Sequence, residues 1–168
     1  MQPWFDLFYT LIFAVPIVCL SIKISTVPLR GVWLFFSFAI LNALVKWGMT
    51  PNIHAAALIK VAALICITIF AVQNRTLCPR GFLCLLIGVY SNAAVRMANK
   101  MRMPATAPLQ FIEKFPSYTL MTTKTHLNML GDWINLPASM SWYSPGDMFI
   151  IAGLAICFLE LSIRKQPR

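Results

Sequence analysis

Residues 81–98 read GFLCLLIGVYSNAAVRMA, an apolar run that continues into a polar and basic segment without any loop signal between the two parts. A stretch of this length is what an α-helix needs to cross a hydrocarbon core of about 30 Å. Asn92, Arg96 and Asn99 are spaced at i, i+4 and i+7, so a helix aligns their side chains in one stripe. The segment therefore predicts a membrane-spanning helix with a polar stripe at its carboxyl end.

The chain as a whole has the composition of a membrane protein. Its 168 residues are 59% hydrophobic and 11% charged, and the mean hydropathy is +0.73, far from the values usual for a soluble domain of this size. Five apolar runs have membrane-spanning length, at residues 4–22, 32–49, 55–72, 81–98 and 148–163. We therefore expect an all-α fold, a bundle of five transmembrane helices, in a single domain that covers residues 1–168.

The connections between these runs differ in length. The first three links are short and contain proline, which is typical of antiparallel neighbouring helices. The last connection, residues 101–145, is long and apolar, and its Trp133, Trp142 and Tyr143 suit a headgroup interface. We expect this outer loop to contain one short interfacial helix over residues 123–130 that ends at Gly131.

The excess of basic residues is typical of a membrane protein whose helix ends carry the charges that set its orientation. The net charge is +9, but the basic residues gather at the ends of the apolar runs, so we expect membrane lipids as partners and no nucleic acid. The residues that we expect on the cytoplasmic side are Lys23, Arg30, Arg75, Arg80, Arg164, Lys165 and Arg168. The pattern predicts a multi-pass protein of the bacterial inner membrane with its N-terminus outside and its C-terminus inside.

A polar cluster is expected where the last two helices meet the outer loop. Ser144-Pro145-Gly146-Asp147 is a typical helix start, with serine as the N-cap, proline at the first helical position and a carboxylate at the third. An arginine without a partner is costly in a poorly hydrated site. We therefore expect Asn92, Arg96, Asn99 and Asp147 to form a structural polar cluster, with Arg96 bonded to Asp147 or to loop carbonyls.

A second set of residues is a candidate contact for lipid or partner proteins. Lys100, Arg102 and Lys124 beside Trp133 and Trp142 have the chemistry to hold an anionic headgroup. The full set of candidate contacts is Lys100, Arg102, Lys124, His126, Trp133, Trp142 and Tyr143. The five cysteines include no Cys-x-x-Cys pair, so we expect neither a disulfide framework nor a zinc site. We also expect no other metal and no cofactor.

Part of this pattern is similar to the lipoprotein signal peptidase, signal peptidase II. That family has Gly-Asn-x-x-Asp-Arg at the outer end of one helix and Asn-x-Ala-Asp at the start of the next. Asn92 and Arg96 match the first motif in spacing and Asp147 matches the second, but Val95 stands at the position of the first catalytic Asp. Aspartic chemistry uses two carboxylates, so the resemblance implies catalysis only if Asp132 supplies the missing one together with Asp147.

The chain more closely resembles a family of uncharacterised bacterial membrane proteins of unknown function with five predicted helices. The residues that carry this resemblance are Asn92, Asn99, Met103-Pro104, His126, Leu130-Gly131-Asp132 and Ser144-Pro145-Gly146-Asp147. The family implies no activity. We favour a non-catalytic accessory or assembly subunit of a larger membrane complex, because no nucleophile, metal or acid–base set is complete. The alternatives are a signal-peptidase-II-like aspartic hydrolase and a small carrier, for which Lys60 is the only charged candidate near mid-membrane.

Overall fold

The computed structural model describes residues 29–46, 49–50, 52–135 and 142–163. The helix expected at residues 4–22 lies outside this part of the chain. The described helices of the apolar runs are α2 (Val32–Lys46), α3 (Ile53–Gln73), α4 (Pro79–Ala98) and α6 (Pro145–Ile163). The long loop contains β1 (Met103–Ala105), α5 (Leu109–Lys114), β2 (Tyr118–Leu120), η1 (Asn128–Leu130), β3 (Ile134–Asn135) and β4 (Trp142–Tyr143).

Three of the described helices, α3, α4 and α6, are long and apolar enough to cross a membrane, and α2 is a shorter apolar helix. Their first residues are typical of helix starts. The Asn52 side chain accepts a hydrogen bond of 2.9 Å from the backbone N–H of Ala55 at the start of α3, and Pro79 and Pro145 open α4 and α6. The described chain is therefore mostly helical, as hydropathy predicts, and compatible with a membrane protein.

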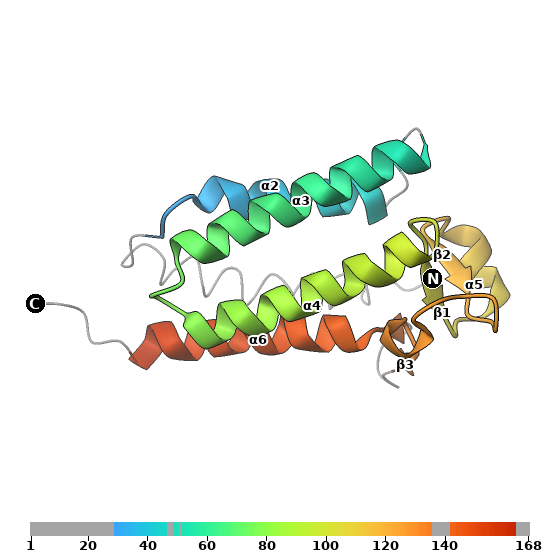
Figure 1. Cartoon of the computed structure of the whole chain (residues 1–168). Coiled ribbons are helices and arrows are strands. Elements are labelled where there is room, and N and C mark those ends of the chain that lie inside the picture. Colours follow the sequence, from blue (N-terminus) through green and yellow to red (C-terminus); the bar gives the residue numbers. More distant parts are fainter. Residues whose placement is uncertain (1–28, 47–48, 51, 136–141, 164–168) are drawn as a thin grey trace, which may run out of the picture.

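The helices form two antiparallel pairs, α2 with α3 and α4 with α6 (Figure 1). The second pair is in close contact because glycines line its interface. A Cβ atom added at Gly153 would lie 2.6 Å from the backbone nitrogen of Leu85, and one added at Gly88 would collide with the carbonyl oxygen of Gly146. Small residues let helix backbones approach in this way in lipid, so α4 and α6 form a tightly packed unit.

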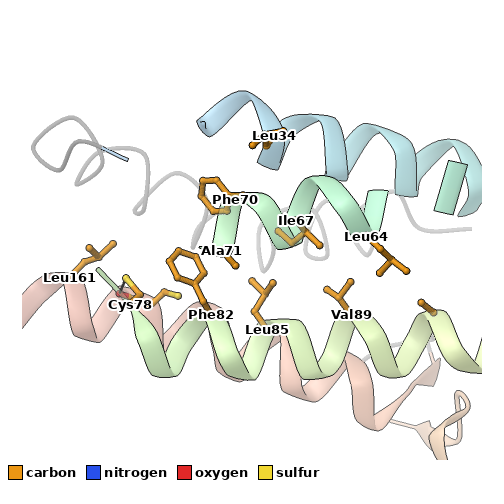
Figure 2. Packing of buried hydrophobic residues seen from close by; sticks show 12 residues of the cluster. Leu34, Leu64, Ile67, Phe70, Ala71, Cys78, Phe82, Leu85, Val89 and Leu161 are labelled. Carbon is orange, nitrogen blue, oxygen red and sulfur yellow. Dashed lines mark hydrogen bonds between the residues drawn. The ribbon is translucent and has the colours of Figure 1, made fainter. Parts of the chain in front are cut away.

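A hydrophobic cluster joins the two pairs. Figure 2 shows Leu64, Ile67 and Phe70 of α3 directed toward Phe82, Leu85 and Val89 of α4. The rings of Phe70 and Phe82 meet edge to face, with centroids 5.6 Å apart, an arrangement that aromatic pairs prefer. Other large apolar side chains on α3, α4 and α6 face outward, as expected for contact with lipid: Leu58, Leu83 and Ile163 are 72%, 61% and 79% exposed.

The long loop is folded, and it differs from the all-α expectation. Strands β1 and β2 pair in parallel, β3 and β4 pair antiparallel, and a further bridge joins Ala105 to Asp132. These elements gather at the end of the bundle where α4 ends (Figure 1). The protein therefore combines a helical bundle with a small mixed loop domain, which we define as residues 99–135 and 142–144.

The prediction of an interfacial helix over residues 123–130 is wrong. Only Asn128–Leu130 is helical there, as a single 3₁₀ turn before Gly131. The hydroxyl of Thr125 donates to the carbonyl of Thr122 at 2.7 Å and accepts from the backbone nitrogen of Thr122 at 2.9 Å. Threonine side chains that bond to nearby backbone compete with helix formation, and Leu127 has a left-handed φ of 56°. The helix of the loop is instead α5.

Candidate functional site

The polar residues of α4 and α6 meet in a cluster of three side chains, Asn92, Ser144 and Asp147, which we name the polar clasp. The Asn92 amide donates to Oδ1 of Asp147 at 2.7 Å, and the Ser144 hydroxyl donates to the Asn92 amide oxygen at 2.8 Å. Oδ2 of Asp147 accepts from the backbone nitrogen of Ser144 at 3.0 Å, and the Asp147 nitrogen donates to the Ser144 hydroxyl at 3.0 Å. The clasp is thus a capping box on α6 that is bonded to α4.

The opposite end of the same helix pair has a matching contact. The carboxylate of Glu160, near the end of α6, accepts hydrogen bonds from the backbone nitrogens of Arg80 and Gly81 at 3.4 and 3.2 Å. These nitrogens belong to the first turn of α4, where backbone donors have no partner within the helix. A carboxylate of α6 therefore holds each end of the α4–α6 pair.

Arg96 lies one turn beyond the clasp and bonds to the loop domain. Its Nη1 donates to the carbonyl oxygen of Ser117 at 3.1 Å, and its guanidinium carbon lies 5.8 Å from the centre of the Tyr118 ring, within cation–π range. Burial, with the negative charge of Asp132 next in importance, raises the pKa of Tyr118 to about 12. Tyr118 therefore stays a neutral phenol beside Arg96 at physiological pH.

Asn99 connects the end of α4 to a more distant part of the loop domain. Its amide nitrogen donates to the carbonyls of Val95 and His126, both at 2.8 Å, and its amide oxygen accepts from the His126 nitrogen at 2.9 Å. The four expected cluster residues therefore form three groups: Asn92 and Asp147 contact each other, whereas Arg96 and Asn99 each bind the loop backbone. Ser144 and Ser117 complete these groups, and the first was foreseen only as a helix cap.

Two positions bear on the hydrolase alternative, that of the missing carboxylate and that of its possible replacement, and both are buried. Val95, at the position of the missing carboxylate, is fully buried. Asp132 is also buried, and its backbone nitrogen donates to the Pro104 carbonyl at 2.8 Å while its carbonyl accepts from Thr106 at 3.1 Å. Among the described residues, no group of three or more His, Cys, Asp or Glu side chains is placed to hold a metal ion.

A pocket of about 680 Å³ lies where α3 begins and α4 ends, against the loop domain. We name it the basic pocket, because Lys100, Arg102, Lys124 and His126 line it. The structure thus brings together four of the seven candidate contacts that are far apart in the sequence. This position was not predicted, since it depends on how the α2–α3 pair lies against the loop.

The aromatic candidates lie elsewhere. None of Trp133, Trp142 and Tyr143 is among the described residues that line the basic pocket. Trp133 is 48% exposed and its indole donates to the Met129 carbonyl at 2.9 Å. The ring of Trp142 packs against Phe111, with centroids 5.4 Å apart, and Tyr143 is buried. Of the three, Trp133 is the most exposed and offers about half of its surface to a partner.

These features define a mostly helical protein with helices of membrane-crossing length, a polar clasp between two of them and a basic pocket at one end. The chain belongs to DUF5317, a family of unknown function, whose model matches residues 26–159. The matched region includes the clasp, the loop domain and the basic pocket. No curated protein and no solved structure matches the chain. Membership of an uncharacterised family is thereby confirmed, whereas the similarity to signal peptidase II is not shown and stays an interpretation of residue spacing.

Proposed function

We propose that this protein is a non-catalytic integral membrane protein that serves as an accessory or assembly subunit of a larger membrane complex. In this proposal it binds partner proteins and anionic lipid through its helices and its loop domain, in the bacterial inner membrane with the loop outside. The observation that carries the proposal is the polar clasp, because both carboxylate oxygens of Asp147 accept hydrogen bonds that build the structure.

The polar residues of the clasp have the bonding of structural groups. Asp147 caps α6 and binds Asn92, while Asn92 uses its amide nitrogen on Asp147 and its amide oxygen on Ser144. A general base needs its carboxylate directed at a water, with a second carboxyl group to share the proton load. The position that would supply the second group is the buried Val95.

An exposed apolar area on the loop domain supports a role in protein contacts. Leu127, Met129 and Trp133 are 45%, 76% and 48% exposed, and the hydrogen bond from Trp133 to the Met129 carbonyl holds the indole in one orientation. Tryptophan and methionine are enriched at protein interfaces, and a rigid aromatic anchor often dominates the binding energy. We therefore assign the partner contact to this area.

Replacement of Trp133 by alanine tests the partner contact. Loss of a central aromatic anchor costs 2 kcal/mol or more in a typical interface, so the Trp133→Ala protein should lose its larger partners when it is purified gently from its native membrane. The measurement is the mass of the detergent-solubilised particle. Trp33→Ala is a matched control, because Trp33 is 68% exposed on α2, far from the loop domain. A wild-type protein that always purifies alone would contradict the proposal.

The hydrolase alternative has one observation in its favour. The negative charges of Asp132 and Asp147 both raise the pKa of Tyr118, so both carboxylates lie within electrostatic range of one side chain of the loop domain. This arrangement is the minimum that two-carboxylate chemistry requires. We rank it second, because the hydrogen bonds of Asp147 are those of a cap and a helix contact. Cleavage of a lipid-modified precursor distinguishes the two functions.

A further inference from the structure

The basic pocket has an unbalanced charge. Lys100, Arg102 and Lys124 line it together with His126, and none of the described lining residues is Asp or Glu. A hollow lined by charges of one sign concentrates the field and attracts ions of the opposite sign. The pocket is therefore an attractive site for an anion.

An uncommon backbone conformation builds one wall of the pocket. Lys100 and Met101 have left-handed φ angles of 54° and 64°, which residues other than glycine seldom adopt. The Met101 nitrogen donates to the Arg96 carbonyl at 2.7 Å and closes the last turn of α4. This turn brings Lys100 and Arg102 to the same pocket. A conformation of this kind is more often kept where a site needs it.

Asn99 holds a second loop segment, which carries Lys124 and His126, at the pocket. Its three hydrogen bonds to Val95 and His126 hold the segment that carries Lys124 and His126 against the end of α4. The polar side chain of Thr119 also lines the pocket. The cationic groups thus come from two segments that a buried asparagine holds together, and their convergence is a property of the fold.

The pocket also has an apolar wall. Val45, Ala56 and Met101 form a small buried cluster between α2, α3 and the end of α4, and the same three residues line the pocket. The pocket lies at the beginning of α3 and the end of α4, the level at which a membrane-crossing helix meets the headgroups. A phospholipid has the same division, with an anionic phosphate beside an apolar glycerol ester and its chains.

We propose that the basic pocket binds a phosphate group, with Lys100, Arg102 and Lys124 as its cationic contacts and the apolar wall as the contact of an attached lipid chain. The pocket volume of about 680 Å³ lies within the range of roughly 300–1,000 Å³ that is usual for small-molecule sites. The inference rests on the lipid-binding part of the proposed function, but not on membership of a complex. A free phosphate compound has the same charge and is the second possible source of the group.

The test compares lipid retention by the full-length protein and two charge variants. Purified protein is reconstituted in nanodiscs that contain phosphatidylglycerol or phosphatidylcholine, and retained lipid is measured by native mass spectrometry. The pocket variant carries Lys100→Gln, Arg102→Gln and Lys124→Gln. The matched control carries Arg30→Gln, Arg75→Gln and Arg80→Gln, which removes the same charge from the opposite ends of the helices. Because each basic residue contributes about 1 kcal/mol near an anionic surface, the pocket variant should bind phosphatidylglycerol about 100-fold more weakly than wild type, and the control variant nearly as tightly.

Competition by glycerol phosphate and inorganic phosphate identifies the source of the group. Displacement of phosphatidylglycerol only by anionic lipid supports a lipid site, and displacement by either soluble compound at equal concentration supports a free phosphate compound. Equal binding by wild type and the pocket variant, or equal loss in both variants, overturns the proposal. A single Lys124→Glu variant, changed on an exposed turn, repeats the test if the triple variant does not fold. Partners that still purify with the pocket variant leave the subunit proposal standing even when the lipid result is negative.

Discussion

Asp147 accepts a hydrogen bond at each carboxylate oxygen, one from Asn92 on the neighbouring helix and one from the backbone of its own helix cap. The second bond could be anticipated from the Ser-Pro-Gly-Asp pattern alone. The meeting of Asn92 with Asp147 was expected as part of a polar cluster, but Arg96 and not Asn92 was the expected candidate partner of Asp147. The alignment of Ser144 with the Asn92 oxygen could not be anticipated, because it depends on how closely α4 and α6 approach.

Replacement of Asn92 by alanine should destabilise the protein. The change removes a hydrogen bond to a charged group, which typically contributes about 1.5–3 kcal/mol, and removes the acceptor of the Ser144 hydroxyl. We expect a lower midpoint of thermal unfolding in detergent and a lower free energy of unfolding by about 2 kcal/mol. Ser91→Ala, one residue away on α4, is the control and should have a small effect. An Asn92→Ala protein as stable as wild type would show that the clasp does not stabilise the helix pair.

At the scale of elements, hydropathy predicted the helices of the apolar runs well. The expected runs at 55–72, 81–98 and 148–163 correspond to α3, α4 and α6 within a few residues at each end, because a membrane-length apolar segment has few alternatives to a helix. The strands of the loop domain could not be predicted in this way. Its strands have two or three residues each, too few for an alternating pattern, and their pairing joins distant segments.

The close contact of α4 and α6 makes a separate prediction. Gly153→Val places side-chain atoms where the backbone of Leu85 lies, so the two helices must move apart. Overpacking of this kind costs roughly 1–3 kcal/mol, and the free energy of unfolding in detergent should fall by that amount. Ala155→Val is the matched control on the same helix, because Ala155 is exposed. Equal stability of both variants would mean that the helix pair is looser than described.

At the scale of the whole molecule, the loop domain and the last described residue of α6 lie at opposite ends of the helices (Figure 1). The basic pocket, which lies where α4 ends, is therefore at the opposite end of the helices from Ile163, the last described residue of α6. The pocket could not be located from the sequence, because its lining combines the end of α2, the beginning of α3 and the end of α4 with three separate segments of the loop. The sequence indicated that its basic residues could hold an anion, but the prediction placed them beside Trp133 and Trp142, which do not line the pocket.

The orientation in the membrane is a prediction of the charge pattern. The three basic residues after α6, Arg164, Lys165 and Arg168, favour the cytoplasmic side. A reporter fused after Arg168 should therefore be active only as a cytoplasmic enzyme, and one inserted in the loop domain only as a periplasmic enzyme. The measurement is the activity of a paired cytoplasmic and periplasmic reporter at each site. Periplasmic activity at Arg168 would reverse the orientation and place the basic pocket on the inner surface.

The proposed function requires that the polar clasp is structural and that the protein does not cleave lipoprotein precursors. The most direct measurement is cleavage of a lipid-modified lipoprotein precursor by the purified wild-type protein, with Asp132→Asn and Asp147→Asn proteins assayed beside it and signal peptidase II as the positive control. We expect no turnover by the wild type or by either variant. Turnover by the wild type that disappears in both variants would show that Asp132 and Asp147 are a catalytic pair and that the clasp is not purely structural.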